Sequence, residues 1–271
     1  MQPLFLNTIL LGGTTAEKIE AAAAAGFDQI ELWRQDVEQA DGDAAAVAGR
    51  LQQARLGLTD YQVLLDFDGA PDGKREAKRA EAIAMLDTAV TVGAGTLLVP
   101  ASTDYACRPE RVVEDMRWLA REAANRGLNV AHEGMAWSTV HHSLPAVWQV
   151  VQEVDEPNLG LVVDAFHIFV RDSTAADLDG IPLDRIFLVQ LSDLNIEASP
   201  GTVVDIARHH RLLPGQGHFP IHSLMDKLQG YHGPIGLEVF NDDMKSRRPA
   251  EVAVEAMAAL RKVLPQAAEA T

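Results

Sequence analysis

Short apolar runs alternate with longer segments of helical composition along the whole chain. We count eight runs, and most are continuous blocks of Val, Leu and Ile rather than strict alternations of apolar and polar residues. Such blocks are typical of strands in a parallel sheet that helices cover. The runs span residues 4–11, 27–33, 58–67, 96–101, 128–137, 159–167, 185–193 and 235–240.

The segments between the runs carry helix start and stop signals. Thr14 and Thr15 are candidate N-caps before an alanine-rich segment that stops at Gly26. The segment after the sixth run is a weaker helix former, because Gly180 and Pro182 interrupt it. The other predicted helices lie within residues 74–95, 108–127, 143–154 and 248–264.

Eight strand–helix units predict an α/β fold, a single (β/α)8 TIM barrel domain over residues 1–271. The competing architecture is a doubly wound open sheet, which more often shows a glycine-rich fingerprint after its first strand. Residues 11–15 offer only two adjacent glycines, too few for that fingerprint. In the barrel, the active site is expected at the C-terminal mouth of the strands.

Four consecutive predicted strands, the fifth to the eighth, carry an oxygen-bearing polar residue at their ends: Glu133, Asp164, Gln190 and Glu238. Three carboxylates in a desolvated barrel mouth would repel one another unless a cation lay between them. The four residues therefore predict a divalent metal site. Ligation by oxygen alone favours Mg²⁺ or Mn²⁺ over zinc, with Co²⁺ as a further candidate.

His167 lies three residues beyond Asp164, where the strand passes into its loop. A single histidine in an apolar run is most often a core residue, but here its imidazole would reach a substrate held at the metal. We predict His167 and Glu133 as catalytic residues, His167 as the group that moves a proton. His132 is expected on the opposite face of the strand as a packing residue, and Asp193 and Asn195 as caps of the next element.

Charge and composition narrow the function classes. The chain has 23 basic against 39 acidic residues, a net charge of −16, which argues against binding phosphate backbones. One cysteine, Cys107, excludes a disulfide framework. The apolar start has no basic leader and is too short to span a bilayer. We expect a cytoplasmic protein that acts on a small molecule and has no membrane or nucleic-acid partner. Assembly into a homo-oligomer is an open alternative.

A local basic cluster follows the seventh predicted strand. Arg208, His209 and Arg211 lie here in an otherwise acidic chain. Arginine binds carboxylates and phosphates through two parallel hydrogen bonds. We predict these three as substrate-binding residues, and a solvated surface loop is the alternative.

Together these residues resemble the sugar phosphate isomerase/epimerase superfamily of xylose-isomerase-like TIM barrels. The resemblance spans essentially the whole chain and lies in Glu133, "DAFH" at 164–167, Gln190, "RLLPGQG" at 211–217 and Glu238. Within the superfamily, "HEGMAW", "FLVQLSD" and "RHHRLLPGQG" are similar to bacterial 3-dehydroshikimate dehydratases.

The resemblance implies a metal-dependent hydro-lyase that converts 3-dehydroshikimate to protocatechuate in quinate and shikimate breakdown. It implies that the metal polarises the ketone, that His167 shuttles a proton, and that Arg211 with Arg208 holds the ring carboxylate. One position departs from the pattern, because Leu65 stands where an arginine is expected before the "DFDG" turn. This departure favours the first alternative, an isomerase or epimerase of a keto-sugar, inosose or hydroxypyruvate-type substrate. A second alternative is a non-catalytic or endonuclease-like barrel, although the acidic charge argues against binding nucleic acid.

Overall fold

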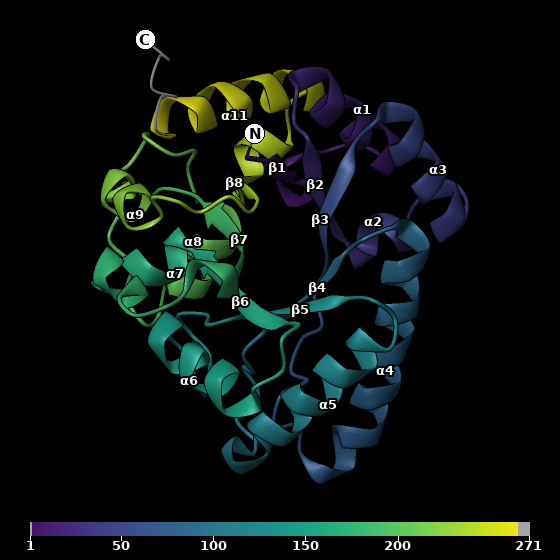
Figure 1. Cartoon of the computed structure of the whole chain (residues 1–271). Coiled ribbons are helices and arrows are strands. Elements are labelled where there is room, and N and C mark those ends of the chain that lie inside the picture. The colour runs from purple at the N-terminus through teal and green to yellow at the C-terminus, as the bar shows by residue number, and fades with distance from the viewer. Residues whose placement is uncertain (1, 265–271) are drawn as a thin grey trace.

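The computed structural model describes residues 2–264, and within them eight parallel strands close into one barrel (Figure 1). Each strand pairs with its neighbours in chain order, and β8 returns to β1. The predicted TIM barrel is confirmed; residue 1 and residues 265–271 of the predicted single domain lie outside the described residues. The strands are β1 (Leu4–Asn7), β2 (Gln29–Trp33), β3 (Gly57–Gln62), β4 (Thr96–Pro100), β5 (Asn129–Glu133), β6 (Leu159–Asp164), β7 (Ile186–Leu191) and β8 (Ile235–Leu237).

Helices surround the barrel, and α11 lies beside α1 to complete the outer ring (Figure 1). The α-helices are α1 (Thr15–Ala25), α2 (Arg34–Glu38), α3 (Ala44–Ala54), α4 (Asp72–Val92), α5 (Val112–Ala124), α6 (Leu144–Val154), α7 (Ala165–Phe169), α8 (Val203–His209), α9 (Ile221–Lys227), α10 (Asp242–Lys245) and α11 (Pro249–Val263). The 3₁₀ helices are η1 (Thr8–Leu10), η2 (Pro109–Arg111), η3 (Ala175–Leu178) and η4 (Leu183–Arg185).

The helix signals in the sequence are used as expected. Thr14 caps α1 in a reciprocal capping box with Glu17, and Gly26 ends the helix in the left-handed conformation at φ 86°. Between β6 and β7 the chain forms only the five-residue α7 and two 3₁₀ turns, as the breaks at Gly180 and Pro182 predicted.

All the strands except β2 end earlier than the apolar runs that predicted them. β1 stops at Asn7, whose Oδ1 accepts the N–H of Ile9 at 3.0 Å and starts η1. β5 stops at Glu133 rather than continuing to Trp137. The polar residue at each end therefore marks the point where the strand passes into its loop.

The barrel interior has an apolar floor with a polar layer above it. Side chains from five strands pack together as the floor: Phe5, Leu98, Ala131, Val162 and Leu188. Residues two apart on a strand point to the same face. Position i+2 from four floor residues is polar and buried: Asn7, Glu133, Asp164 and Gln190.

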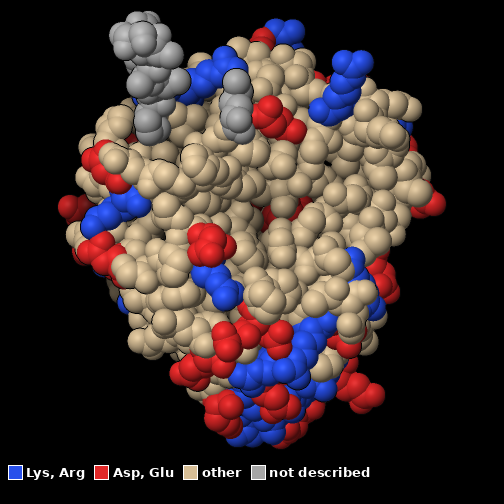
Figure 2. Space-filling view, in the orientation of Figure 1, with Lys and Arg blue, Asp and Glu red and all other residues tan. Residues whose placement is uncertain are grey.

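The outer surface carries charges of both signs. On the face drawn in Figure 2, basic and acidic side chains are interleaved at the lower end, near α4 and α5 in Figure 1, instead of forming a basic patch. One such set joins Arg75 to Glu114 and Asp115 at 2.7 Å each. Among the described residues, no helix is long and apolar enough to cross a membrane.

Candidate metal and substrate site

The four residues predicted as metal ligands come together at one end of the barrel. Glu133 and Asp164 are the last residues of β5 and β6, Gln190 lies on β7, and Glu238 follows β8. Asp164 is the register partner of Gln190, which is in turn the partner of Gly236. All four side chains are buried, with 0–7% exposed. The shared strand geometry therefore brings three carboxylates and one amide to a single polar layer.

The guanidinium of Arg211 bridges two of these carboxylates. Its Nη1 donates to Asp164 Oδ2 at 3.0 Å and to Glu238 Oε2 at 3.1 Å. The rings of Phe166 and Phe240 lie 4.4 and 5.1 Å from the guanidinium carbon. Arg211 is thus a buried, fixed cation inside the acidic cluster. The sequence predicted Arg211 to bind substrate, and in the structure its guanidinium is bonded to two carboxylates of the cluster.

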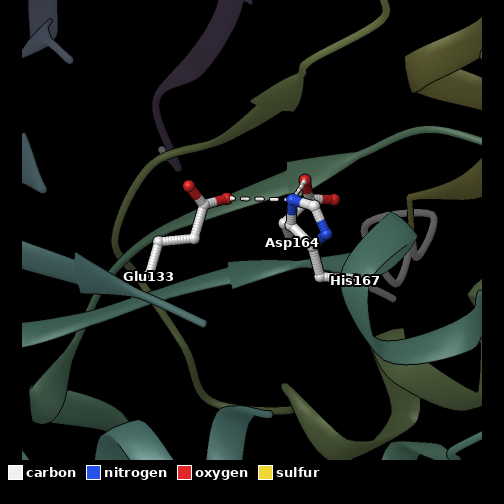
Figure 3. Close-up of side chains that lie close together, drawn as sticks. All are labelled: Glu133, Asp164 and His167. Carbon is white, nitrogen blue, oxygen red and sulfur yellow. Dashed lines mark ion pairs between the residues drawn. The ribbon is translucent and has the colours of Figure 1, made fainter. Parts of the chain in front are cut away.

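His167 faces the same cluster from α7 (Figure 3). Its Nε2 lies 3.5 Å from Asp164 Oδ2 and 3.7 Å from Glu133 Oε1. On the other side of the ring, Nδ1 accepts the backbone N–H of Ala136 at 3.1 Å. A neutral imidazole has one donor and one acceptor nitrogen, so the proton of the neutral ring lies on Nε2. His167 therefore presents an N–H, rather than a lone pair, to the carboxylates.

Burial sets the protonation of this cluster. Desolvation raises the pKa of Glu133 well above its ordinary value, and repulsion from Glu238 and Asp164 adds to the effect. Desolvation also raises the pKa of Glu238 to about 7, although Arg211 opposes this. For His167, desolvation lowers the pKa to about 4, so the ring is neutral near pH 7. These carboxylates can all be ionised near pH 7 only if a further positive charge lies among them.

The unsatisfied atoms of the cluster fit a metal ion. Glu133 Oε1 and Gln190 Oε1 are buried oxygens without a hydrogen-bond partner. Ligand atoms of Glu133, Asp164 and His167 all lie within 4.8 Å of one another. Because Ala136 leaves the proton of the His167 ring on Nε2, we assign the donor set to oxygen atoms and not to this histidine. Buried oxygens of this kind suit a hard divalent cation.

A pocket of about 350 Å³ opens onto the cluster and has two unlike sides. The apolar side is built by Val63, Leu65, Pro100 and Met135, which end or follow β3, β4 and β5, the strands opposite β7 and β8 in the closed barrel; Trp33, Trp137 and Phe240 also line the pocket. The other side carries the basic residues Arg208, His209 and Lys245. The pocket therefore fits a ligand with one anionic end and one apolar edge.

All three residues predicted to bind substrate, Arg208, His209 and Arg211, line the pocket. Arg208 and His209 lie at the end of α8 and line the pocket. His209 Nδ1 lies 2.9 Å from Asp242 Oδ2, so this acid partly neutralises the histidine when it is charged. Leu65 is 46% exposed at the pocket edge, while Arg75 is held by Glu114 and Asp115 on the outer surface.

Several pocket residues were not predicted. Trp33 is the last residue of β2, and its Nε1 donates to Asn7 Oδ1 at 2.6 Å; its position at a strand end was the available signal. Lys245 lies on the four-residue α10, and no motif in the sequence marks it.

Asp193 and His132 were expected outside the site, and the structure describes what they do. The carboxylate of Asp193 accepts four backbone N–H groups, those of Leu194, Gly215, Gly217 and Phe219, at 2.8–2.9 Å. Asp193 thus fixes the turn after Arg211 in addition to capping the residue beside it. His132 is fully buried on the outer side of β5, where Nδ1 donates to Val99 O at 2.8 Å.

Comparison with protein families matches residues 19–263 to the xylose isomerase-like TIM barrel model. The chain belongs to that family. The resemblance inferred from the strand-end residues is therefore confirmed.

Within this family, the most similar relatives include two bacterial enzymes. The chain is 33% identical over 261 residues to a 3-dehydroshikimate dehydratase of Pseudomonas aeruginosa, and 31% identical over 259 residues to one of Pseudomonas putida. Each match covers 94% of this chain and 40% of the relative, so the chain spans less than half the length of either protein. An inosose isomerase of Halalkalibacterium halodurans is 28% identical over 129 residues, which are 46% of this chain and 44% of the isomerase.

Solved structures repeat the same fold. A xylose isomerase-like TIM barrel/4-hydroxyphenylpyruvate dioxygenase fusion protein superposes with a TM-score of 0.92 at 29% identity, over 97% of this chain and 42% of the fusion. The IOLI protein with a bound zinc atom gives a TM-score of 0.86 at 20% identity, over 97% and 98% of the two chains. The second likeness concerns the barrel fold alone.

Proposed function

We propose that this protein is a divalent-metal-dependent dehydratase that removes water from 3-dehydroshikimate, or a close cyclic keto-acid, to give protocatechuate. The observation that carries the proposal is the pocket with a basic side and an apolar side, opening onto a buried carboxylate cluster. The two dehydratase relatives, similar over 94% of the chain, support the same activity.

In this proposal Glu133, Asp164, Gln190 and Glu238 hold the cation, Mg²⁺ or Mn²⁺, with Co²⁺ as a further candidate. When bound, the cation supplies Lewis-acid polarisation of a substrate carbonyl. The charge count of the site agrees with a divalent ion. Three carboxylates and the Arg211 guanidinium sum to −3 + 1 = −2, which one divalent cation neutralises.

The protein's own groups divide the proton transfers between them. Loss of water breaks one C–H and one C–O bond and forms a C=C bond, with the proton and hydroxide leaving together as water. The resulting dienone becomes aromatic when a ring CH₂ proton is lost and the ketone oxygen gains a proton. Glu133 would bind the cation through one carboxylate oxygen, and with the other it accepts the proton from the carbon beside the ketone and passes it to the departing hydroxyl, which leaves as water. His167 donates a hydrogen bond from Nε2 to the oxygen of the departing hydroxyl, because Ala136 occupies Nδ1.

Substrate orientation follows from the two pocket sides. The ring carboxylate lies toward Arg208 and Lys245, and the ring edge lies against Leu65 and Met135. Arg211 holds two of the cluster carboxylates in place and gives the site its fixed positive charge. In this arrangement, Arg208 on α8 and Lys245 on α10 bind the substrate carboxylate in place of the arginine expected at position 65.

An isomerase of an inosose or keto-sugar is the second candidate, favoured by Leu65 and by the inosose isomerase relatives. A fully hydroxylated ring needs hydrogen-bond partners on every side, because burying an unpaired hydroxyl is costly. The apolar wall of Val63, Leu65 and Met135 offers none from its side chains. The pocket therefore favours the keto-acid.

The decisive assay supplies chelator-treated protein with Mn²⁺ and 3-dehydroshikimate and follows protocatechuate by its ultraviolet absorbance. We expect product only with added metal, and its loss in Glu133→Gln. Turnover of an inosose without any protocatechuate would replace the dehydratase proposal by the isomerase one.

A further inference from the structure

A hydrogen bond crosses the barrel interior beneath the proposed metal site. Gln190 on β7 donates from Nε2 to Glu31 Oε1 on β2 at 2.7 Å. Glu31 and Gln190 are 159 positions apart, and both side chains are completely buried. Two strands, β8 and β1, separate β7 from β2 in the sheet. The contact therefore exists only because the barrel is closed.

This bond decides which end of the Gln190 amide stays free. Glu31 Oε1 accepts this bond, so the NH₂ end of the amide faces Glu31. The opposite orientation would set two oxygens against each other at hydrogen-bond distance. The amide oxygen is thereby left on the side away from Glu31, and Gln190 Oε1 is indeed buried without a partner.

We propose that Glu31 is a positioning residue that presents the oxygen of Gln190 to a divalent cation. The inference rests on the metal site of the proposed function. An amide can turn either its oxygen or its NH₂ to a cation, and only the oxygen binds. Glu31 removes that ambiguity, so the site gains a fourth oxygen ligand while its charge stays at −2.

Glu31 does not belong to the cluster that would touch the cation. It shares a register level with Asn7 on β1 and Asp60 on β3. Its second oxygen, Oε2, has no partner, and neither has Asp60 Oδ1. Asp60 is equally buried and repels Glu133 and Glu238, but no hydrogen bond joins it to Glu133, Asp164, Gln190 or Glu238 among the described residues, so it shares the charge effect and lacks the orienting bond. Asp60 therefore provides a matched control.

The test is Mn²⁺ binding to chelator-treated protein, followed by electron paramagnetic resonance of the free ion, with no substrate present. Glu31→Gln keeps the side-chain shape but can donate or accept, so the Gln190 amide can turn either way. We expect Mn²⁺ to bind about 10–100-fold more weakly, the usual effect of losing a partner that orients a metal ligand. Asp60→Asn removes a nearby charge and leaves the orienting bond in place, so it is expected to weaken Mn²⁺ binding less than Glu31→Gln does.

A compensating exchange separates orientation from general damage. In the double variant Glu31→Gln, Gln190→Glu, position 190 has oxygens at both ends, so orientation no longer matters, and the amide introduced at position 31 donates to one of them. We expect Mn²⁺ affinity to recover to within about threefold of the original protein. Gln190→Glu alone places two carboxylates together and is expected to bind less tightly than the double variant. If Glu31→Gln fails to fold, as judged by circular dichroism, Glu31→Asp and the double variant carry the test.

The outcomes separate the two proposals. If the unaltered protein does not bind Mn²⁺, the metal site fails, and the role of Glu31 fails with it. If it binds Mn²⁺ and Glu31→Gln binds equally well, only the orienting role is overturned. That role is also overturned if Asp60→Asn weakens binding as much as Glu31→Gln, or if the double variant shows no recovery.

Discussion

At the scale of single residues, the site depends on buried groups whose charge is set by one or two contacts. Arg211 keeps Asp164 and Glu238 paired, and Ala136 fixes the proton of the neutral His167 ring on Nε2. Neither contact involves a solvent-exposed group. Substitutions here change chemistry and folding together, so residues at the pocket edge are better probes of substrate binding.

Lys245 is such a probe, because it lines the basic side of the pocket and is exposed. Lys245→Met is expected to raise KM for 3-dehydroshikimate about tenfold with little change in kcat, as loss of one contact to a carboxylate predicts. Steady-state kinetics measure this. Lys227→Met, which breaks a surface pair with Asp179, serves as control and leaves KM unchanged. An unaltered KM in Lys245→Met would remove Lys245 from substrate recognition.

Asp68, a buried residue outside the candidate site, is expected to make the stability of the fold depend on pH. Both of its carboxylate oxygens are buried without partners, and desolvation raises the pKa of Asp68 to about 7. A group with a raised folded pKa holds its proton more tightly when folded, so the free energy of unfolding falls as pH rises from about 4 to about 7. The full loss is on the order of 4 kcal/mol.

Asp68→Asn removes this titration. We expect the variant to be more stable than the unaltered protein at pH 8 and to lose that advantage by pH 4, as measured by urea unfolding. Asp72→Asn is a control of opposite sign, because its bond to Arg111 lowers the pKa of the exposed Asp72 carboxyl. A stability difference for Asp68→Asn that does not vary with pH contradicts the assignment.

At the scale of elements, the four strands β5 to β8 each place a site residue two positions after a residue at the level of the barrel floor. Ala131 precedes Glu133 in this way on β5, and Val162 precedes Asp164 on β6. In β8 the floor position is Gly236, which faces Phe5 of β1 across the sheet register. The site residue Glu238 follows it by two. Packing of the floor therefore sets the height of the site residues.

Gly236 tests this coupling. A Cβ added there would lie 2.2 Å from Phe5 O and 2.3 Å from Phe5 Cγ, whereas one added at Gly95 meets nothing within 4 Å. We expect Gly236→Ala to destabilise the fold by about 1–3 kcal/mol or more and to weaken Mn²⁺ binding. Gly95→Ala is expected to be close to neutral. Thermal unfolding and Mn²⁺ titration of both variants check this, and equal effects would refute the coupling.

The same pairing explains how much the sequence could predict. An apolar run that ends in an acid indicates both a strand and its site residue, so the barrel and the positions of Glu133, Asp164, Gln190 and Glu238 were predictable. The contact between Glu31 and Gln190 was not, because it depends on barrel closure and curvature. Lys245 was missed because a four-residue helix leaves no periodic pattern.

At the scale of the whole molecule, the barrel holds more buried acid than its own cations balance. Burial raises the pKa values of Glu31, Asp60 and Glu133 well above their ordinary range. Each such group makes the metal-free fold less stable as pH rises through the interval between its unfolded and folded pKa. A bound cation offsets this loss of stability only for the carboxylates that it contacts.

We therefore expect metal and pH to act together on stability. In chelator, the free energy of unfolding falls from about pH 4 upward, and the part of this loss that is due to Glu238 is complete near pH 7. Mn²⁺ at 100 times its Kd adds about 2.7 kcal/mol by mass action. Urea unfolding from pH 5 to 8 in chelator and in Mn²⁺ measures both. Coincident curves at pH 7.5 would contradict a metal site in the folded state.

The proposed metal ligands and the pocket walls belong to different kinds of structural element. The proposed metal ligands stand on or directly after strands whose register is fixed by neighbours on both sides. The pocket walls, by contrast, come from the loop that carries Leu65 and from the short helices α8 and α10. Loops tolerate sequence change far better than barrel strands. Exchange of those segments is therefore expected to change which ligand the pocket accepts while the proposed metal site stays unchanged.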